Sequence, residues 1–119
     1  MSSLEHLAEP APTVIESGAL RIRTAPGADS CLVSLEGELD LESASTLELE
    51  LRRLLDAGLA SIAVDLEGLE FVDSTGLQSL VRIAREAADR DEIVSFTRPH
   101  GAVAKLFRLT GLSEALRFA

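Results

Sequence analysis

The stretch Ser61–Leu80, SIAVDLEGLEFVDSTGLQSL, contains two different hydrophobic patterns with a polar turn between them. Its first part, Ser61–Leu66, is a short run of apolar residues on both faces, which is typical of a strand in the centre of a sheet. We expect Glu67–Glu70 to form a loop after this strand. From Leu77 onward, apolar residues recur at helical spacing and predict an amphipathic helix. A buried strand followed by a helix favours an α/β fold.

The rest of the chain extends this alternation. The predicted elements are, in order, strands at 19–24 and 31–35, a helix after Asp40, a strand at 61–66, a helix from about 75, a strand at 92–97 and a short helix around 103–107. The order β-β-α-β-α-β-α predicts a mixed, mostly parallel four-stranded sheet packed with helices. Residues 1–17 contain Pro10 and Pro12 and little periodicity, so we expect a flexible tail before a single domain at 18–119.

Charge and composition argue against several classes of function. The formal net charge is −9 and the sequence has no basic stripe, so nucleic acid and anionic membranes are poor partners. The sequence shows neither a signal peptide nor a membrane span, and we expect a cytoplasmic protein. Cys31 is the only cysteine and falls in a strand pattern, which favours a buried small side chain over redox chemistry.

Patterns typical of enzymes and metal sites are missing from the sequence. Ser74 lies in VDSTG rather than in the GxSxG turn of a hydrolase, and neither His6 nor His100 is near it in sequence. No histidines or cysteines have the spacing of metal ligands, and no glycine-rich phosphate loop is present. We therefore predict no catalytic residue, metal or cofactor, and a hydrolase that uses Ser74 is the weakest alternative.

The turn before the second helix holds the most informative polar residues. Asp73, Ser74 and Thr75 are all of the types that cap helix N-termini. If Thr75 is the cap, Gln78 falls three residues later and completes a capping box. Ser74 would then lie just outside the helix with a free hydroxyl. The alternative is that Ser74 itself caps the helix and has no further role.

Three motifs make the chain resemble the anti-sigma factor antagonists of the STAS fold. They are Gly37–Asp40 (GELD), Val64–Leu77 (VDLEGLEFVDSTGL) and Val103–Leu112 (VAKLFRLTGL). GELD and DSTGL are weak signals individually, but all three motifs occur in order and at suitable spacing in a chain of this predicted topology. The resemblance extends from about Ala19 to Phe118.

The resemblance implies a bacterial regulator of transcription in the stress response, and not an enzyme. The unphosphorylated form of such a protein binds a GHKL-type anti-sigma factor, which is also a serine kinase, and the sigma factor is released. Phosphorylation at Ser74, with Thr75 as the second choice, switches binding off, and a PP2C-type phosphatase restores it. ATP and its metal belong to the kinase. The alternative is a non-switching STAS scaffold or a nucleotide-binding module, as in stressosomes.

The residues expected to bind the partner are Asp40, Asp73, Ser74, Thr75, Gly76 and Leu77. Asp40 ends the second predicted strand, and parallel crossovers should place it beside the Ser74 turn. We expect Gly76 to let a partner's backbone come close. A phosphate adds about −1.5 to −2 charges, and a helix N-terminus tolerates such an anion. The expected switch therefore acts by repulsion and desolvation at the contact surface.

Overall fold

The computed structural model describes residues 11–97 and 99–110. The strands are β1 (Thr13–Ser17), β2 (Leu20–Pro26), β3 (Ser30–Leu39), β4 (Ser61–Val72) and β5 (Ile93–Phe96), and the helices are α2 (Leu41–Asp56), α3 (Ser74–Asp89) and α4 (Gly101–Thr110). One sheet contains the strands in the order β1-β2-β3-β4-β5. The pairs β1–β2 and β2–β3 are antiparallel, whereas β3–β4 and β4–β5 are parallel. The predicted α/β class with a mixed sheet is confirmed.

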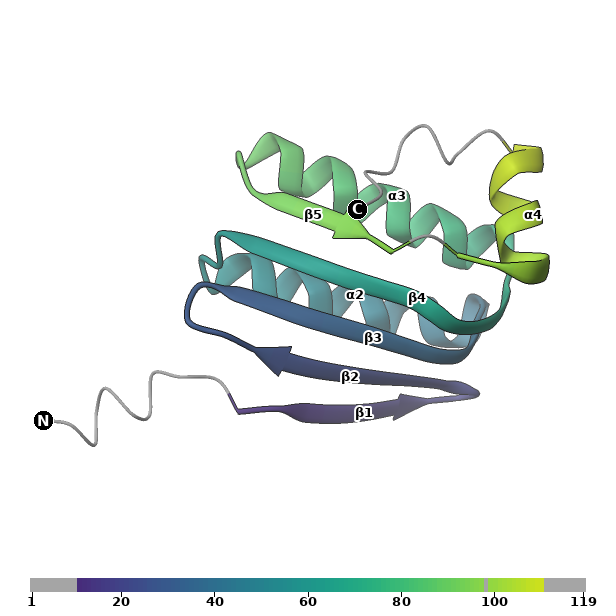
Figure 1. The fold of residues 1–119 in the computed structure, drawn as a ribbon, viewed down its shortest axis with the longest axis horizontal. Coiled ribbons are helices and arrows are strands. Elements are labelled where there is room, and N and C mark those ends of the chain that lie inside the picture. The colour runs from purple at the N-terminus through teal and green to yellow at the C-terminus, as the bar shows by residue number, and fades with distance from the viewer. Residues whose placement is uncertain (1–10, 98, 111–119) are drawn as a thin grey trace, which may run out of the picture.

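Helices α2 and α3 lie side by side and cover one face of the sheet, while α4 lies at the end where β4 stops (Figure 1). The core between helices and sheet is mainly aliphatic, and the aromatic residues Phe96 and Phe107 are among its largest fully buried side chains. Both helices bury a leucine-rich stripe, represented by Leu47 and Leu51 in α2 and by Leu80 in α3. Each such side chain contributes about 1.5–3 kcal/mol of burial free energy, which holds the helices firmly on the sheet.

The sheet has five strands and not the predicted four. The additional strand, β1, falls within the segment that the sequence assigned to a tail, and it pairs with β2 from Thr13↔Thr24 to Ser17↔Leu20. Of its residues, Ile15 is the hydrophobic one that packs against the core. So short a strand gives too little alternation to be recognised, and its pairing with β2 determines its structure.

Strand β4 is also longer than predicted, because Glu67–Glu70 continues the strand and does not form a loop. Its partner β3 keeps pairing with it as far as Leu39↔Val72, across two register shifts. Gly68 makes this possible, since a Cβ at this position would lie 2.7 Å from the carbonyl oxygen of Leu35. The consequence is that β3 and β4 end side by side.

Candidate functional site

The ends of β3 and β4 bring two aspartates into neighbouring positions. The amide of Asp73 donates a hydrogen bond to the carbonyl oxygen of Leu39, at 3.1 Å. Asp40 follows Leu39 directly, so each aspartate stands between the end of a strand and the start of a helix. Helices α2 and α3 both begin at this end of the sheet (Figure 1). The proximity that was expected from parallel crossovers is therefore present.

Asp40 caps helix α2, as predicted. Its Oδ1 accepts hydrogen bonds from the amides of Glu42, at 3.1 Å, and Ser43, at 3.2 Å. The Ser43 hydroxyl in turn accepts a bond from the Asp40 amide, at 3.1 Å, which completes a capping box. This carboxylate is therefore committed to satisfying the first turn of α2.

Asp73 caps helix α3, so the assignment of Thr75 as the cap is wrong, as is the alternative that Ser74 is the cap. Asp73 Oδ1 accepts from the Gly76 amide at 2.8 Å. Its Oδ2 accepts from the Leu41 amide, which begins α2, at 3.1 Å. One carboxylate therefore joins the N-termini of both helices, where its negative charge also complements the two helix dipoles. The sequence could not reveal this, because Leu41 belongs to a distant segment.

Ser74 and Thr75 consequently occupy the first two positions inside α3. The side chain of Ser74 is exposed, and its hydroxyl has no hydrogen-bond partner among the described residues. Thr75 is half-buried, and its carbonyl oxygen accepts a bond from the Ser79 hydroxyl at 3.1 Å. Of the two hydroxyls considered as phosphate acceptors, that of Ser74 is the more accessible.

Gly76 and Leu77 are buried beneath the surface on which Ser74 is exposed. A Cβ on Gly76 would come within 2.6 Å of the Leu39 carbonyl oxygen and 3.0 Å of Val72 Cγ2. The space that this glycine leaves open is therefore filled by the chain's own strand ends, which corrects the expectation that it admits a partner's backbone. Leu77 is fully buried. Both residues support the position of Ser74 from within the fold.

The ends of β3 and β4 and the starts of α2 and α3 together form one corner of the fold, around Asp40 and Asp73–Thr75. Two apolar side chains that the sequence did not single out are exposed at this corner. Leu41 is 74% exposed and Phe71 is 48% exposed. Phe71 also lines a shallow groove between the end of β4 and helix α4, with Glu70, Val72, Ala102, Val103 and Leu106. Hydrophobic periodicity assigns such residues to a core, and only the packing shows that they face solvent.

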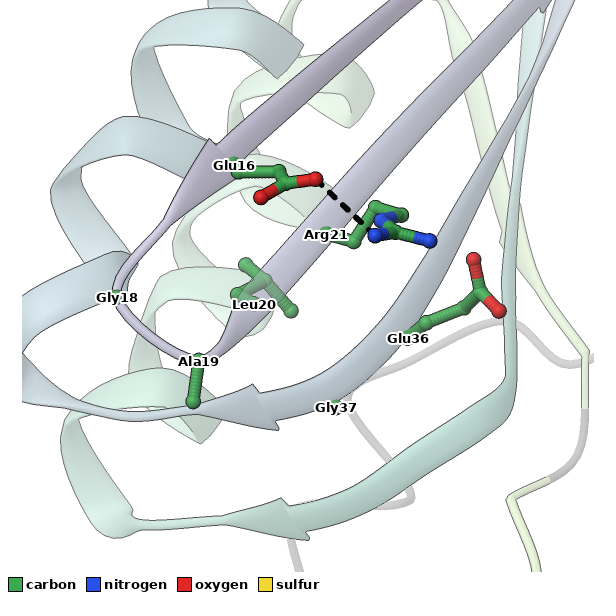
Figure 2. Close-up of a pocket in the computed structure, with 7 residues that line it drawn as sticks. All are labelled: Glu16, Gly18, Ala19, Leu20, Arg21, Glu36 and Gly37. Atoms are coloured by element: carbon green, nitrogen blue, oxygen red, sulfur yellow. Dashed lines mark hydrogen bonds and ion pairs between the residues drawn. The ribbon is translucent and has the colours of Figure 1, made fainter.

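A second hollow lies at the turn between β1 and β2, where Figure 2 shows Arg21 between two carboxylates. Arg21 forms an ion pair with Glu16 at 3.1 Å, and its strand partner in β3 is Glu36. Gly37 forms one wall, and its φ of 97° brings it against the carbonyl of Ala19. Because Arg21 pairs with Glu16 and Arg23 pairs with Glu36 at 2.8 Å, this hollow offers little uncompensated charge to a ligand.

The other candidate groups lie apart from this corner or form bonds of their own. Cys31 is buried in the core, and burial raises the pKa of its thiol. His100 Nε2 lies 2.8 Å from the carbonyl oxygen of Glu67. His6 and residues 111–112 of the third motif are outside the described residues. Across residues 11–97 and 99–110, no group of three or more His, Cys, Asp and Glu side chains could hold a metal ion.

Comparison with known proteins identifies the family. A family model described as "Mlab, STAS domain" matches residues 22–117. The anti-sigma-B factor antagonist of Staphylococcus aureus is 30% identical over 84 residues, which cover 71% of this chain and 78% of the relative. The chain belongs to the STAS family of anti-sigma factor antagonists. The match covers the strand ends and helix N-termini that form the corner around Ser74.

Solved structures show the same STAS fold. An anti-sigma factor antagonist from Mycobacterium paratuberculosis superposes with a TM-score of 0.68 at 21% identity, over 91% of this chain and 85% of that one. The Bacillus cell fate determinant SpoIIAA in its phosphorylated form gives a TM-score of 0.60 at 19% identity, over 92% and 91%. The described part of this STAS domain contains no helix that is long and apolar enough to cross a membrane.

Proposed function

We propose that this STAS domain is a phosphorylation-controlled anti-sigma factor antagonist. In the unphosphorylated form it binds a GHKL-type anti-sigma factor, which is also its serine kinase, and thereby releases a sigma factor in a stress response. The observation that carries the proposal is the exposed Ser74 hydroxyl at the first position of α3, on a corner that Asp73 holds in place. Family membership and the S. aureus relative give further support.

The proposed switch adds charge to a surface without refolding it. A phosphate on Ser74 would lie at the N-terminus of α3, where helix dipole and first-turn amides tolerate an anion. It would add about −1.5 to −2 charges next to Asp73 and close to Asp40, in a chain whose net charge is already −9. A partner selected to contact the uncharged serine would then have to desolvate a dianion, which costs binding free energy.

The partners carry out the chemistry of the proposed switch. The kinase supplies ATP and its metal, and a PP2C-type phosphatase removes the phosphate, so the STAS domain itself acts as substrate and ligand and not as an enzyme. Because the proposed partners control transcription, we propose that the protein is cytoplasmic. We propose Asp40, Asp73, Ser74 and Thr75 as the part of the predicted binding set that a partner meets, with Gly76 and Leu77 supporting them.

The test is incubation of the full chain with candidate GHKL kinases and ATP, followed by intact mass measurement and site mapping. We expect one added phosphate at Ser74, none in Ser74→Ala, and unchanged modification in Thr75→Ala. Ser74→Ala should stay bound to the kinase in the presence of ATP, because it cannot be phosphorylated. Ser74→Glu should bind the kinase at least about tenfold more weakly than the unphosphorylated wild type does, which corresponds to roughly 1.4 kcal/mol. Ser45→Glu is the matched control, because Ser45 is an exposed serine in the first turns of α2.

Two outcomes would contradict the proposal. If Ser74→Ala and Ser74→Glu both bound the kinase as the wild type does, charge at this position would not control binding. If no candidate kinase modified the chain and the isolated chain bound ATP or GTP directly, the non-switching scaffold or nucleotide-binding module would be the better description.

A further inference from the structure

We propose that Leu41 and Phe71 are the two apolar anchors through which the chain docks on its anti-sigma factor. The receiving surface of that partner is apolar at its centre and basic at its rim. This inference rests on the proposed function and specifies the contact that the Ser74 switch interrupts. The occupant of this surface is the anti-sigma factor, and the exposed side chains and charges around Ser74 indicate the chemistry of its contact surface.

Leu41 is an exposed leucine on a rigid backbone. It is the first residue of α2, and its side chain is 74% exposed while the core-facing stripe of the helix is supplied by other residues. Its amide is held by Asp73 Oδ2 at 3.1 Å, and the same carboxylate caps the helix that begins with Ser74. Little conformational freedom of the backbone would be lost when Leu41 enters a partner's pocket, so most of its burial free energy would be available for binding.

Phe71 provides the second anchor from the end of β4. It precedes Asp73 by two residues, and its backbone is fixed by pairing with Glu38 of β3. Its ring is 48% exposed and forms one wall of the groove along α4, so a partner side chain could lie against the ring and the groove floor together. Aromatic side chains of this kind contribute large apolar area to interfaces at a small cost in conformational entropy.

The charges around the anchors define the rim. Glu38, Glu42 and Glu70 are exposed, and none of them forms an ion pair with another residue in the described ranges. Lysine and arginine side chains on the partner would complement them, which would increase the association rate more than the final affinity. A partner with an acidic or purely apolar surface would leave these carboxylates without compensation.

The arrangement also explains why modification of Ser74 would be effective. Leu41 is connected to Asp73 by a hydrogen bond, and Phe71 is two residues before it, so both anchors lie close to the serine. A phosphate there would place a strongly hydrated dianion beside the two side chains that must be dehydrated for docking. The switch would then act on the anchors through water and charge, while the fold stays as it is.

The test is calorimetric titration of one anti-sigma factor with the full chain and with Leu41→Ala, Phe71→Ala and the double variant. Leu49→Ala is the matched control, since Leu49 is on the same helix and is 68% exposed. We expect each anchor variant to weaken binding about 10- to 100-fold, as truncated interface hot spots do, and the control to stay within about twofold. Phe71→Leu, which keeps an apolar side chain on the strand, should show an intermediate loss and a native circular dichroism spectrum.

The outcomes separate this inference from the function on which it rests. If the wild type binds and Ser74→Glu does not, but both anchor variants bind as the wild type does, the anchors are wrong and the proposed function stands. If the wild type binds no anti-sigma factor, the proposed function fails and the docking surface fails with it. Equal losses in Leu49→Ala and Leu41→Ala would also overturn the assignment, because the effect would not be specific to this corner.

Discussion

The carboxylate of Asp73 accepts a hydrogen bond from the amide of Leu41, which is 32 residues earlier in the chain, at a distance of 3.1 Å. The other oxygen of the same carboxylate caps α3 through Gly76. A single side chain therefore satisfies one unpaired amide at the start of each helix. The corner that presents Ser74 is consequently fixed to α2 as well as to α3.

Removing this carboxylate should loosen both helix N-termini. We expect Asp73→Ala to lower the free energy of unfolding by about 1–2 kcal/mol, in the range of lost helix caps, as measured by urea denaturation. Asp73→Asn keeps one acceptor oxygen and should lose less. The specific readout is amide hydrogen exchange at Leu41, which should accelerate in both variants. Exchange at Glu42, whose amide is bonded to Asp40, should change little and serves as the control. If the Leu41 amide were equally protected in the wild type and in both variants, the hydrogen bond from Leu41 to Asp73 would be contradicted.

Gly76 tests the close packing beneath Ser74. Alanine is normally the better helix former by about 1 kcal/mol. Here, however, its Cβ would lie 2.6 Å from the Leu39 carbonyl oxygen and 2.7 Å from Leu39 Cγ. We expect Gly76→Ala to destabilise the fold by about 1–3 kcal/mol, as overpacking does. Thermal denaturation should show a lower Tm than for Ser74→Ala, the matched change two residues away on the exposed side. A gain in Tm would show that helix propensity outweighs the contact.

How far the sequence predicts this fold depends on whether the deciding signal is local. Asp40 was recognised as the cap of α2, because its donors come from the next three residues. Asp73 was only one of three candidate caps, because Ser74 and Thr75 beside it are equally good capping types and its donor in α3, Gly76, is just as local. The bond from Leu41, which joins Asp73 to α2, comes from another segment and leaves no local signal. Strand β1 was missed for the same reason, since its alignment with β2 and not its own pattern makes it a strand.

The residues of the candidate site likewise differ in whether a local sequence signal could identify them. A family resemblance and a polar turn were enough to select Ser74, and the structure places it exposed at the start of α3. The helical spacing of apolar residues correctly predicted that Leu77 belongs to the buried stripe of α3, but nothing in the sequence showed that Leu41, at the start of α2, is exposed. Which leucine faces water depends on how each helix meets the sheet, and this is a property of the tertiary packing.

Ion pairs between α2 and α3 provide a prediction on pH dependence. The pairs are Arg82–Glu48, Arg52–Glu86 and Arg90–Asp56. In each pair the residues are 34 positions apart, because the two helices run side by side in matching register. Hydrogen bonds from Arg52 hold the pKa of Glu86 below its ordinary value of 4.5. The folded state therefore favours the ionised carboxylate.

The sign of the effect follows from this lowered pKa. The stabilisation by Glu86 is complete above pH 4.5, the ordinary pKa of the unfolded carboxyl, and is lost as the pH falls through the lower pKa of the folded state. We expect Glu86→Gln to lose up to about 1 kcal/mol at pH 7 and to flatten the decline in stability below pH 4.5, measured by urea denaturation across this range. Glu16→Gln removes a carboxylate from an exposed pair with Arg21, and it should have a smaller effect on the stability at pH 7 and on the decline in stability at acidic pH. If the stability of Glu86→Gln declined below pH 4.5 as steeply as that of the wild type, the stabilising role of the ionised Glu86 would be contradicted.

Strand β1 can be tested with two adjacent residues that face opposite ways. Ile15 is half-buried and packs against the core, whereas Val14 is 56% exposed. We expect Ile15→Ala to lower the free energy of unfolding by about 1–2 kcal/mol, since part of a core side chain is removed, and Val14→Ala to stay within about 0.5 kcal/mol. Urea denaturation of both variants decides the matter. If the two changes had equally small effects, residues 13–17 would behave as the tail that the sequence alone suggested, and the stable sheet would begin at β2.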